Sequence, residues 1–377
     1  MKRPGNWVLG CILTSTLLAG CSTVSETVNK LNPFSSSAPK VKVAELTPFP
    51  ASIDARIAWQ ANAGAAGDYV FTPAVVKESV FVAAADGTVT RFDGGRQIWR
   101  ADAGVPLSGG VGADSELLVV GSPKGDVLAF DAVSGKEVWR ARVSSEILAA
   151  PALDDTLVVV RSGDSRLFGF DRKDGTRRWV YQRSTPALSL RSDVGVLLQD
   201  KVAVAGFPGG KLVAVNTQNG AAMWEVPVAL PRGATELERI ADISSLPVVD
   251  RQQICAVAYQ GRVACFDLAH GSMLWSRDVS SSVGMDVDSS HVYVSDDKGS
   301  VLAFDRQTGA SLWKQDKLAN RRLTRPLVVG SQVAVADFQG FVHLLDRNDG
   351  AFAGRIATDG SPVVGELRRL GDGLLVQ

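Results

Sequence analysis

The chain has 377 residues, with 40 Lys and Arg against 40 Asp and Glu, 45% hydrophobic residues and 37 glycines. A balanced charge provides no long-range attraction for phosphate backbones or acidic membranes, so the composition argues against nucleic-acid binding. The mean hydropathy of +0.08 and the many glycines are typical of a globular chain of short strands and turns.

The first twenty residues are typical of a bacterial lipoprotein signal peptide. A positively charged start precedes an apolar stretch over residues 8–18, which is too short to span a membrane as a helix. The tetrapeptide Leu18-Ala19-Gly20-Cys21 resembles the lipobox, in which the cysteine is lipidated and becomes the mature N-terminus. The alternative is an ordinary secretory signal with an incidental cysteine. Ser22 stands where an inner-membrane retention signal would have Asp, which implies an outer-membrane anchor in a Gram-negative cell.

Residues 21–50 comprise the lipidated cysteine and a segment rich in Ser, Thr, Pro and Ala. Such a composition cannot bury a core, so it predicts a flexible tether. Residues 51–377 are expected to form the globular part, which the lipid would hold at the periplasmic face of the outer membrane.

A unit repeats along this globular part. In one copy, Gly125–Trp139, an alternating strand ends in Phe-Asp, a glycine follows four residues later, and a tryptophan follows after four more. A shorter copy ends at Trp99, and a later copy has Gly354 where the tryptophan would fall. The tryptophans of the repeat are Trp59, Trp99, Trp139, Trp179, Trp224, Trp275 and Trp313, spaced 40, 40, 40, 45, 51 and 38 residues apart. Together these copies make eight units of about 40 residues, the length of a four-stranded propeller blade.

We therefore predict an all-β fold, an eight-bladed β-propeller of four-stranded antiparallel blades whose ring is closed by N- and C-terminal strands. Asp131 is expected to accept backbone hydrogen bonds in its turn, and Gly135 to supply a positive φ. Trp139 is expected on the outermost strand, where its ring would cover the gap to the neighbouring blade. This predicts a structural role for the repeated residues.

The last blade is predicted to be incomplete. Trp59 is expected on an outermost strand, so the C-terminal segment must supply the inner strands of that blade. Residues 361–364 and 373–377 are expected to be the first and second strands, but no third strand can be found. The unpaired edge that results is a liability for stability and aggregation.

The Ala-Phe-Asp-x-x-x-Gly-x-x-x-Trp unit resembles the repeat shared by quinoprotein dehydrogenases and the BamB family of outer-membrane assembly lipoproteins. The lipobox, the tether, the eight units and the length resemble the BamB family over almost the whole chain. The segments 188–191 and 236–242, which lie where the tryptophan spacing rises to 45 and 51, resemble loops that contact the periplasmic POTRA domains of BamA. The resemblance gives Leu188, Leu190, Arg191 and Asp242 as candidate partner-binding residues. Ser244 stands where the family often has a second Asp, which weakens the acidic part of this surface. The alternative is that the two leucines cover the propeller and Arg191 is solvated.

The resemblance implies a non-catalytic scaffold of the outer-membrane β-barrel assembly machinery. Its expected partners are BamA and the rest of the assembly complex, unfolded outer-membrane proteins through strand addition, and the membrane through the N-terminal lipid. Fold alone does not decide function, so two alternatives remain: a periplasmic quinoprotein-like dehydrogenase, or a propeller scaffold for another envelope partner.

No catalytic residue, cofactor or metal site is predicted. The related quinoprotein enzymes typically have a disulfide between adjacent cysteines and a calcium-binding set of Glu, Asn and Asp. This chain has no adjacent cysteines and no insertion large enough to cover a cofactor. His270, His291 and His343 lack the spacing of metal ligands, and each is expected to be solvated or to lie in a turn.

Two of the four cysteines, Cys255 and Cys265, flank a predicted turn and are expected nearly opposite each other on neighbouring strands. A disulfide can form in the oxidising periplasm. Regular cross-strand geometry is not ideal for one, so two buried thiols are favoured.

Overall fold

The computed structural model describes residues 42–377, so the predicted signal peptide, Cys21 and most of the predicted tether lie outside the described residues. Within that range the regular elements are all strands. A search of the same residues finds no helix with the length and apolar character needed to cross a membrane.

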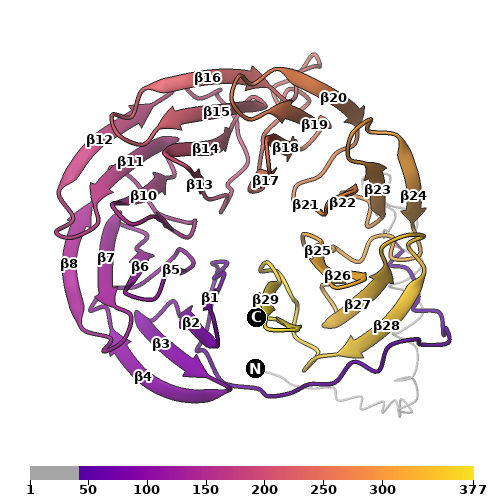
Figure 1. The fold of residues 1–377 in the computed structure, drawn as a ribbon, viewed down its shortest axis with the longest axis horizontal. Coiled ribbons are helices and arrows are strands. Elements are labelled where there is room, and N and C mark those ends of the chain that lie inside the picture. The colour runs from indigo at the N-terminus through magenta and orange to yellow at the C-terminus, as the bar shows by residue number, and fades with distance from the viewer. Residues whose placement is uncertain (1–41) are drawn as a thin grey trace, which may run out of the picture. The chain divides into compact units, whose positions relative to one another are not determined.

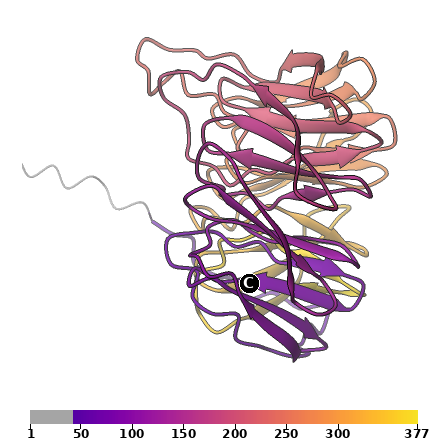
Figure 2. The ribbon, with the colours of Figure 1, turned by 90° about the vertical axis from the view of Figure 1, so that its left-hand side faces the viewer.

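Seven antiparallel sheets of four strands lie side by side in a ring and are followed by a two-stranded sheet (Figure 1). We name the seven sheets blades A to G in chain order and the last sheet H. The first strand of each blade lies nearest the centre, and the fourth lies at the circumference (Figure 1). Sheet H lies between blades G and A, because β29 contacts both β1 and β25. The ring confirms the predicted all-β propeller, and Figure 2 shows it from the side.

Blades A to G each have four strands, and sheet H has two. Blade A has β1 (Ala74–Val76), β2 (Ser79–Ala83), β3 (Thr88–Asp93) and β4 (Arg96–Asp102); blade B has β5 (Gly112–Ala113), β6 (Leu117–Gly121), β7 (Asp126–Asp131) and β8 (Glu137–Arg142). Blade C has β9 (Ala152–Leu153), β10 (Leu157–Ser162), β11 (Arg166–Asp171) and β12 (Arg177–Gln182); blade D has β13 (Leu197–Gln199), β14 (Val202–Phe207), β15 (Lys211–Asn216) and β16 (Ala222–Pro227). Blade E has β17 (Val248–Asp250), β18 (Gln253–Val257), β19 (Arg262–Asp267) and β20 (Met273–Asp278); blade F has β21 (Gly284–Val287), β22 (His291–Ser295), β23 (Val301–Asp305) and β24 (Ser311–Gln315). Blade G has β25 (Leu327–Val329), β26 (Gln332–Ala336), β27 (Phe341–Asp346) and β28 (Phe352–Ala357); sheet H has β29 (Arg368–Leu370) and β30 (Gly373–Leu375).

The hydrophobic core lies between neighbouring blades. In blade B, all five residues of β6 and the four central residues of β7 are buried. Because each blade is covered on both faces by its neighbours, its middle strands are apolar at successive positions rather than at alternate ones.

The repeated residues occupy equivalent places in successive blades. In blade B, the Asp131 carboxylate accepts a 2.6 Å hydrogen bond from the N–H of Ser134, and Gly135 has a φ of +71°. Both observations confirm the predicted turn.

Each indole of the repeat reaches the blade that follows it. Trp139 Nε1 donates a 2.8 Å hydrogen bond to the carbonyl oxygen of Arg172, and a Cβ on Gly175 would lie 2.6 Å from the Trp139 ring. An indole hydrogen bond to a carbonyl of the next blade recurs at Trp99, Trp179, Trp224, Trp275 and Trp313. The tryptophans therefore join successive blades near the circumference.

The last blade has two strands among the described residues, as predicted, but the strand assignments differ. Residues 361–364 form no strand, and the first strand is β29, because the short turn with positive φ at Gly371 pairs β30 with the residues just before it. Trp59 is also not in a strand, since residues 56–61 have no neighbouring strand with which to form a ladder. Its ring nevertheless packs as in the other units, with a Cβ on Gly95 placed 3.0 Å from it.

The expectation of two free thiols is wrong. Cys255 on β18 and Cys265 on β19 are paired in register with their Cα atoms 4.0 Å apart, and the structure joins them in a disulfide. The direct cross-strand register brings the two side chains to the same face of blade E.

Candidate partner-binding site

Two long connections form the candidate site. Residues 183–196 join β12 at the circumference to β13 near the centre, and residues 228–247 join β16 to β17 in the same way. Hydrogen bonds tie the two together: Leu190 N–H donates to Asp242, and the Ser192 hydroxyl donates to the Ser244 carbonyl oxygen at 3.4 Å. The lengthened units of the repeat thus form one continuous surface feature.

Asp242 lies beneath this feature. Only 3% of the residue is exposed, and its two carboxylate oxygens accept hydrogen bonds from the N–H groups of Leu190 at 2.6 Å and Gly209 at 2.9 Å. Arg161 adds a positive charge from blade C; burial lowers its pKa to about 10, and the negative charge of Asp242 opposes this shift. The expectation that Asp242 offers its charge to a partner is therefore not met here, because the carboxylate is already occupied inside the protein.

The surface above Asp242 combines apolar and charged groups. Leu188 is 46% exposed, and Leu190 is partly buried. The Arg191 guanidinium is exposed and pairs with Glu146, with Nη2 3.0 Å from Oε2, and its central carbon lies 5.7 Å from the centre of the Tyr69 ring. Glu146 comes from the connection between β8 and β9, and Tyr69 from the segment before β1. Two distant segments of the chain thus contact the Arg191 guanidinium.

Sequence reasoning missed Glu146, Tyr69 and two exposed leucines. Leu230 and Leu237, in the connection over residues 228–247, are 55% and 69% exposed. Apolar residues within a lengthened connection are a signal that could have identified the leucines. No local sequence signal marks Glu146 or Tyr69, because folding alone brings them to Arg191.

The centre of the ring holds a polar cavity of about 470 Å³. Its charged lining residues are three arginines, Arg325, Arg368 and Arg369, and two acids, Asp193 and Glu366. Glu366 pairs with Arg325 at 3.2 Å and with Arg368 at 3.0 Å. Asp193, an exposed residue, also lines the cavity. Among the residues that the structure describes, no group of three or more His, Cys, Asp or Glu is placed to hold a metal ion.

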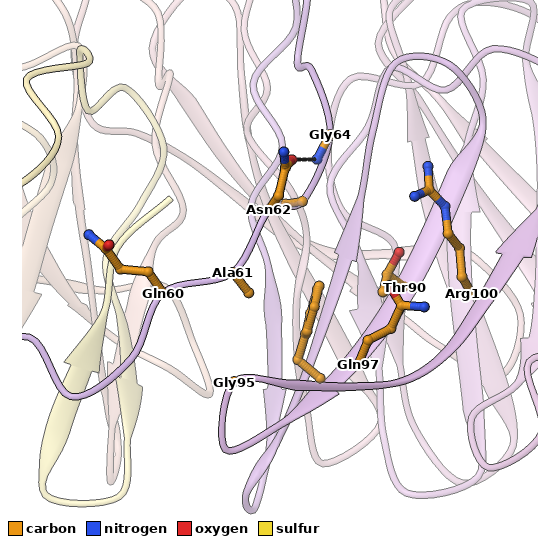
Figure 3. Close-up of a pocket in the computed structure, with 10 residues that line it drawn as sticks. Gln60, Ala61, Asn62, Gly64, Thr90, Gly95, Gln97 and Arg100 are labelled. Atoms are coloured by element: carbon orange, nitrogen blue, oxygen red, sulfur yellow. Dashed lines mark hydrogen bonds between the residues drawn. The ribbon is translucent and has the colours of Figure 1, made fainter.

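A second cleft, of about 550 Å³, lies between residues 60–64 and the outer strands of blade A (Figure 3). Its polar lining consists mainly of neutral groups, such as Gln60, Asn62 and Gln97, with Arg100 as its charged residue. Asn62 is used locally, since its side-chain oxygen accepts a 2.9 Å hydrogen bond from the Gly64 N–H (Figure 3). None of the residues lining this cleft carries a carboxylate, imidazole or thiol, so it offers no general acid or base.

The three histidines lie apart. His270 is exposed in a turn beside Asp267, as expected, and His291 lies partly buried beside Asp288. The expectation is wrong for His343, which is fully buried on β27 because both of its ring nitrogens have hydrogen-bond partners within blade G.

Comparisons with known proteins identify the family and support the fold. The family described as outer membrane protein assembly factor BamB matches residues 85–315. Outer membrane protein assembly factor BamB of Bordetella pertussis is 41% identical over 381 residues, covering 100% of this chain and 96% of the relative. The crystal structure of BamB from Moraxella catarrhalis has a TM-score of 0.78 at 29% identity, covering 82% of this chain and 94% of that one. A quinohemoprotein alcohol dehydrogenase from Comamonas testosteroni has a TM-score of 0.70 at 14% identity, covering 85% of this chain and 72% of that one, a likeness of fold alone.

Proposed function

Because this chain belongs to the family of the outer membrane protein assembly factor BamB, it acts in outer-membrane protein assembly, and we propose that it does so as a non-catalytic scaffold. In this proposal it binds the periplasmic POTRA domains of BamA through the surface formed by Leu188, Leu190 and Arg191. Lipid on Cys21 would anchor it to the outer membrane, facing the periplasm. Unfolded outer-membrane proteins are a further proposed partner.

The observation that supports this proposal is an exposed leucine beside an arginine that the fold already holds in place. Burying Leu188 and Leu190 against a partner would supply apolar contact area, and the planar guanidinium of Arg191 can pair bidentately with a carboxylate. Glu146 and Tyr69 restrict the motion of Arg191 before binding, which lowers the entropic cost of the complex.

Asp242 has a different role in the proposal. Because its carboxylate is buried, it acts through the backbone of Leu190 rather than by contact with the partner. The connection over residues 228–247 would thus support the loop over residues 183–196, and it adds Leu230 and Leu237 as exposed apolar groups nearby.

The test measures binding of the detergent-solubilised full chain to purified BamA periplasmic domains. Replacing both Leu190 and Arg191 by Ala should weaken binding at least tenfold, since hot-spot residues each contribute about 1–2 kcal/mol or more. The matched control replaces Leu312 and Lys314 by Ala; Leu312 is 47% exposed and Lys314 is also exposed, on β24 of blade F. This control should bind as the parent does. Full affinity in the Leu190/Arg191 variant would reject the surface, and no binding by the parent would reject the proposed partner.

A further inference from the structure

Blade G has Gly354 where blades A to F have the tryptophan of the repeat. Gly354 lies on β28, and its φ is outside the left-handed region, so the backbone does not require glycine. A Cβ at this position would lie 3.3 Å from Leu344 Cδ1 of the same blade, and at contact distance from Ile53, 3.4 Å from its carbonyl oxygen and 3.6 Å from its Cβ. Residues 43–55, which we call the strap, thus lie in contact with the position of Gly354, and a side chain as large as an indole there would have to displace them.

Backbone hydrogen bonds hold the strap at both ends. The N–H groups of Ser52 and Ile53 donate to the carbonyl oxygen of Ala353 at 2.9 and 3.0 Å. Towards the other end, Ala44 N–H donates to the carbonyl oxygen of Ala319 at 2.9 Å. These hydrogen bonds therefore fix the position of the strap on blade G and on the connection that precedes it.

Apolar side chains of the strap complete the packing of blade G. Leu46 joins the core cluster between blades F and G, and Phe49 stacks on Phe352 with ring centres 5.2 Å apart. Ile53 and Ala55 belong to a cluster that also contains residues of blade G and sheet H. The strap therefore covers the seam where an indole of blade G would otherwise pack.

Two arginines connect the strap to the interior of blade G. Arg321 Nη1 donates to the carbonyl oxygen of Ala44 at 2.9 Å, and Arg355 Nη1 donates to that of Thr47 at 3.1 Å. The Arg355 guanidinium carbon also lies 4.9 Å from the centre of the Phe49 ring.

The same two arginines also contact a buried pair of side chains, Asp337 and His343. Asp337 and His343 are fully buried, and one carboxylate oxygen of Asp337 lies 2.6 Å from Arg321 Nε and 2.9 Å from His343 Nε2. Arg355 Nε donates to His343 Nδ1 at 3.1 Å. Burying the ionisable groups of Asp337, His343 and Arg321 is costly unless they are paired, and here the hydrogen bonds extend through Arg321 and the partly buried Arg355 to the strap carbonyls. The network thus orients the two arginines towards the strap.

We propose that the strap is a separate docking element that substitutes for the indole that blade G lacks, closing the seam between blade G and sheet H. The Asp337–His343–Arg355 network with Arg321 presents the donors that dock it. Release of the strap would uncover the apolar cluster at this seam without opening the other blades. This inference is independent of the partner-binding surface, which lies on other blades.

The test is hydrogen exchange of the full chain, followed by mass spectrometry of the strap peptides. Replacing Gly354 with a tryptophan, Gly354→Trp, should speed exchange of the strap at least tenfold, because the indole takes the place of Ile53. Exchange in blades C and D should stay as in the parent. A strap as protected as in the parent would overturn the proposal, because the indole would then have found room beside it.

A second variant guards against a general failure to fold. Ile53→Asp changes no residue of blade G. It should release the strap alone, because it places a charge in the apolar cluster that Ile53 joins. The matched control is Ile57→Asp just outside the strap, where Ile57 is already 51% exposed and a charge should leave strap exchange unchanged. If Ile53→Asp instead speeds exchange throughout the ring, the strap is an inseparable part of the core and the proposal fails.

Discussion

The backbone N–H of Leu190 donates a 2.6 Å hydrogen bond to Asp242, a carboxylate in a different connection that is only 3% exposed. Asp242→Ala should therefore loosen the loop of Leu190 and weaken BamA binding about tenfold, on the order of 1–2 kcal/mol for lost hydrogen bonds to a charged group. Amide exchange at Leu190 in the free chain should speed up in parallel. Asp242→Asn, which keeps one acceptor oxygen, should have a smaller effect on both quantities. Weaker binding with unchanged exchange at Leu190 would mean that Asp242 contacts the partner directly.

The indoles at the circumference should contribute strongly to stability. Trp139 is buried, lies against Gly175 and donates to the carbonyl oxygen of Arg172. Trp139→Ala should cost about 3–5 kcal/mol of unfolding free energy, through lost burial and the cavity left behind. Chemical denaturation measures this loss, and Trp139→Phe, which keeps an aromatic ring, should cost less. An unchanged unfolding free energy for Trp139→Ala would remove the packing argument.

Stability should decrease as the pH falls, because of the buried pair in blade G. Burial alone would raise the pKa of Asp337, but hydrogen bonds from His343, Arg321 and two backbone N–H groups outweigh it and lower the pKa to about 2. Burial lowers the pKa of His343, against the opposing effect of Asp337, and the positive charges of Arg355 and Arg321 act in the same direction as burial. Both shifts mean that the unfolded chain binds protons more readily than the folded one.

His343 and Asp337 each lower the unfolding free energy over a different pH range. His343 begins to reduce stability as the pH falls through about 6.5, and Asp337 as the pH falls from about 4 towards 2. Denaturation of the parent should show a lower unfolding free energy at pH 5 than at pH 7.5. His343→Gln should flatten this difference, whereas His270→Gln, in an exposed turn, should not. An identical pH profile for His343→Gln and the parent would contradict the prediction.

The disulfide of blade E should stabilise the fold. Cys255 and Cys265 are ten residues apart in sequence, so the bond restricts the unfolded chain moderately. Replacing both by Ala should lower the unfolding free energy by about 2–3 kcal/mol. Mass spectrometry without reduction should first show that the bond forms, and full thiol labelling of the native chain would refute it.

The repeat architecture was predictable from the spacing of residues along the chain. The spacing of the tryptophans and of the Asp-to-Gly turns predicted the propeller. Each turn requires a residue that tolerates positive φ, and the tryptophan on an outer strand covers the gap to the next blade. These preferences depend on residues close together in sequence, so the turns and strands can be predicted from the sequence alone. The lengthened units also pointed to the connections that carry Leu188 and Leu190.

Contacts between distant segments were decided only by the tertiary structure. The pairing register of β18 and β19 brings Cys255 and Cys265 together in a disulfide. Packing places Asp242 beneath Leu190 instead of at the surface. The strap packs against the strand that carries Gly354, a contact between segments about 300 residues apart in sequence. These outcomes depend on which residues meet across the ring, and burial and hydrogen bonding between remote segments leave no periodic trace in the sequence.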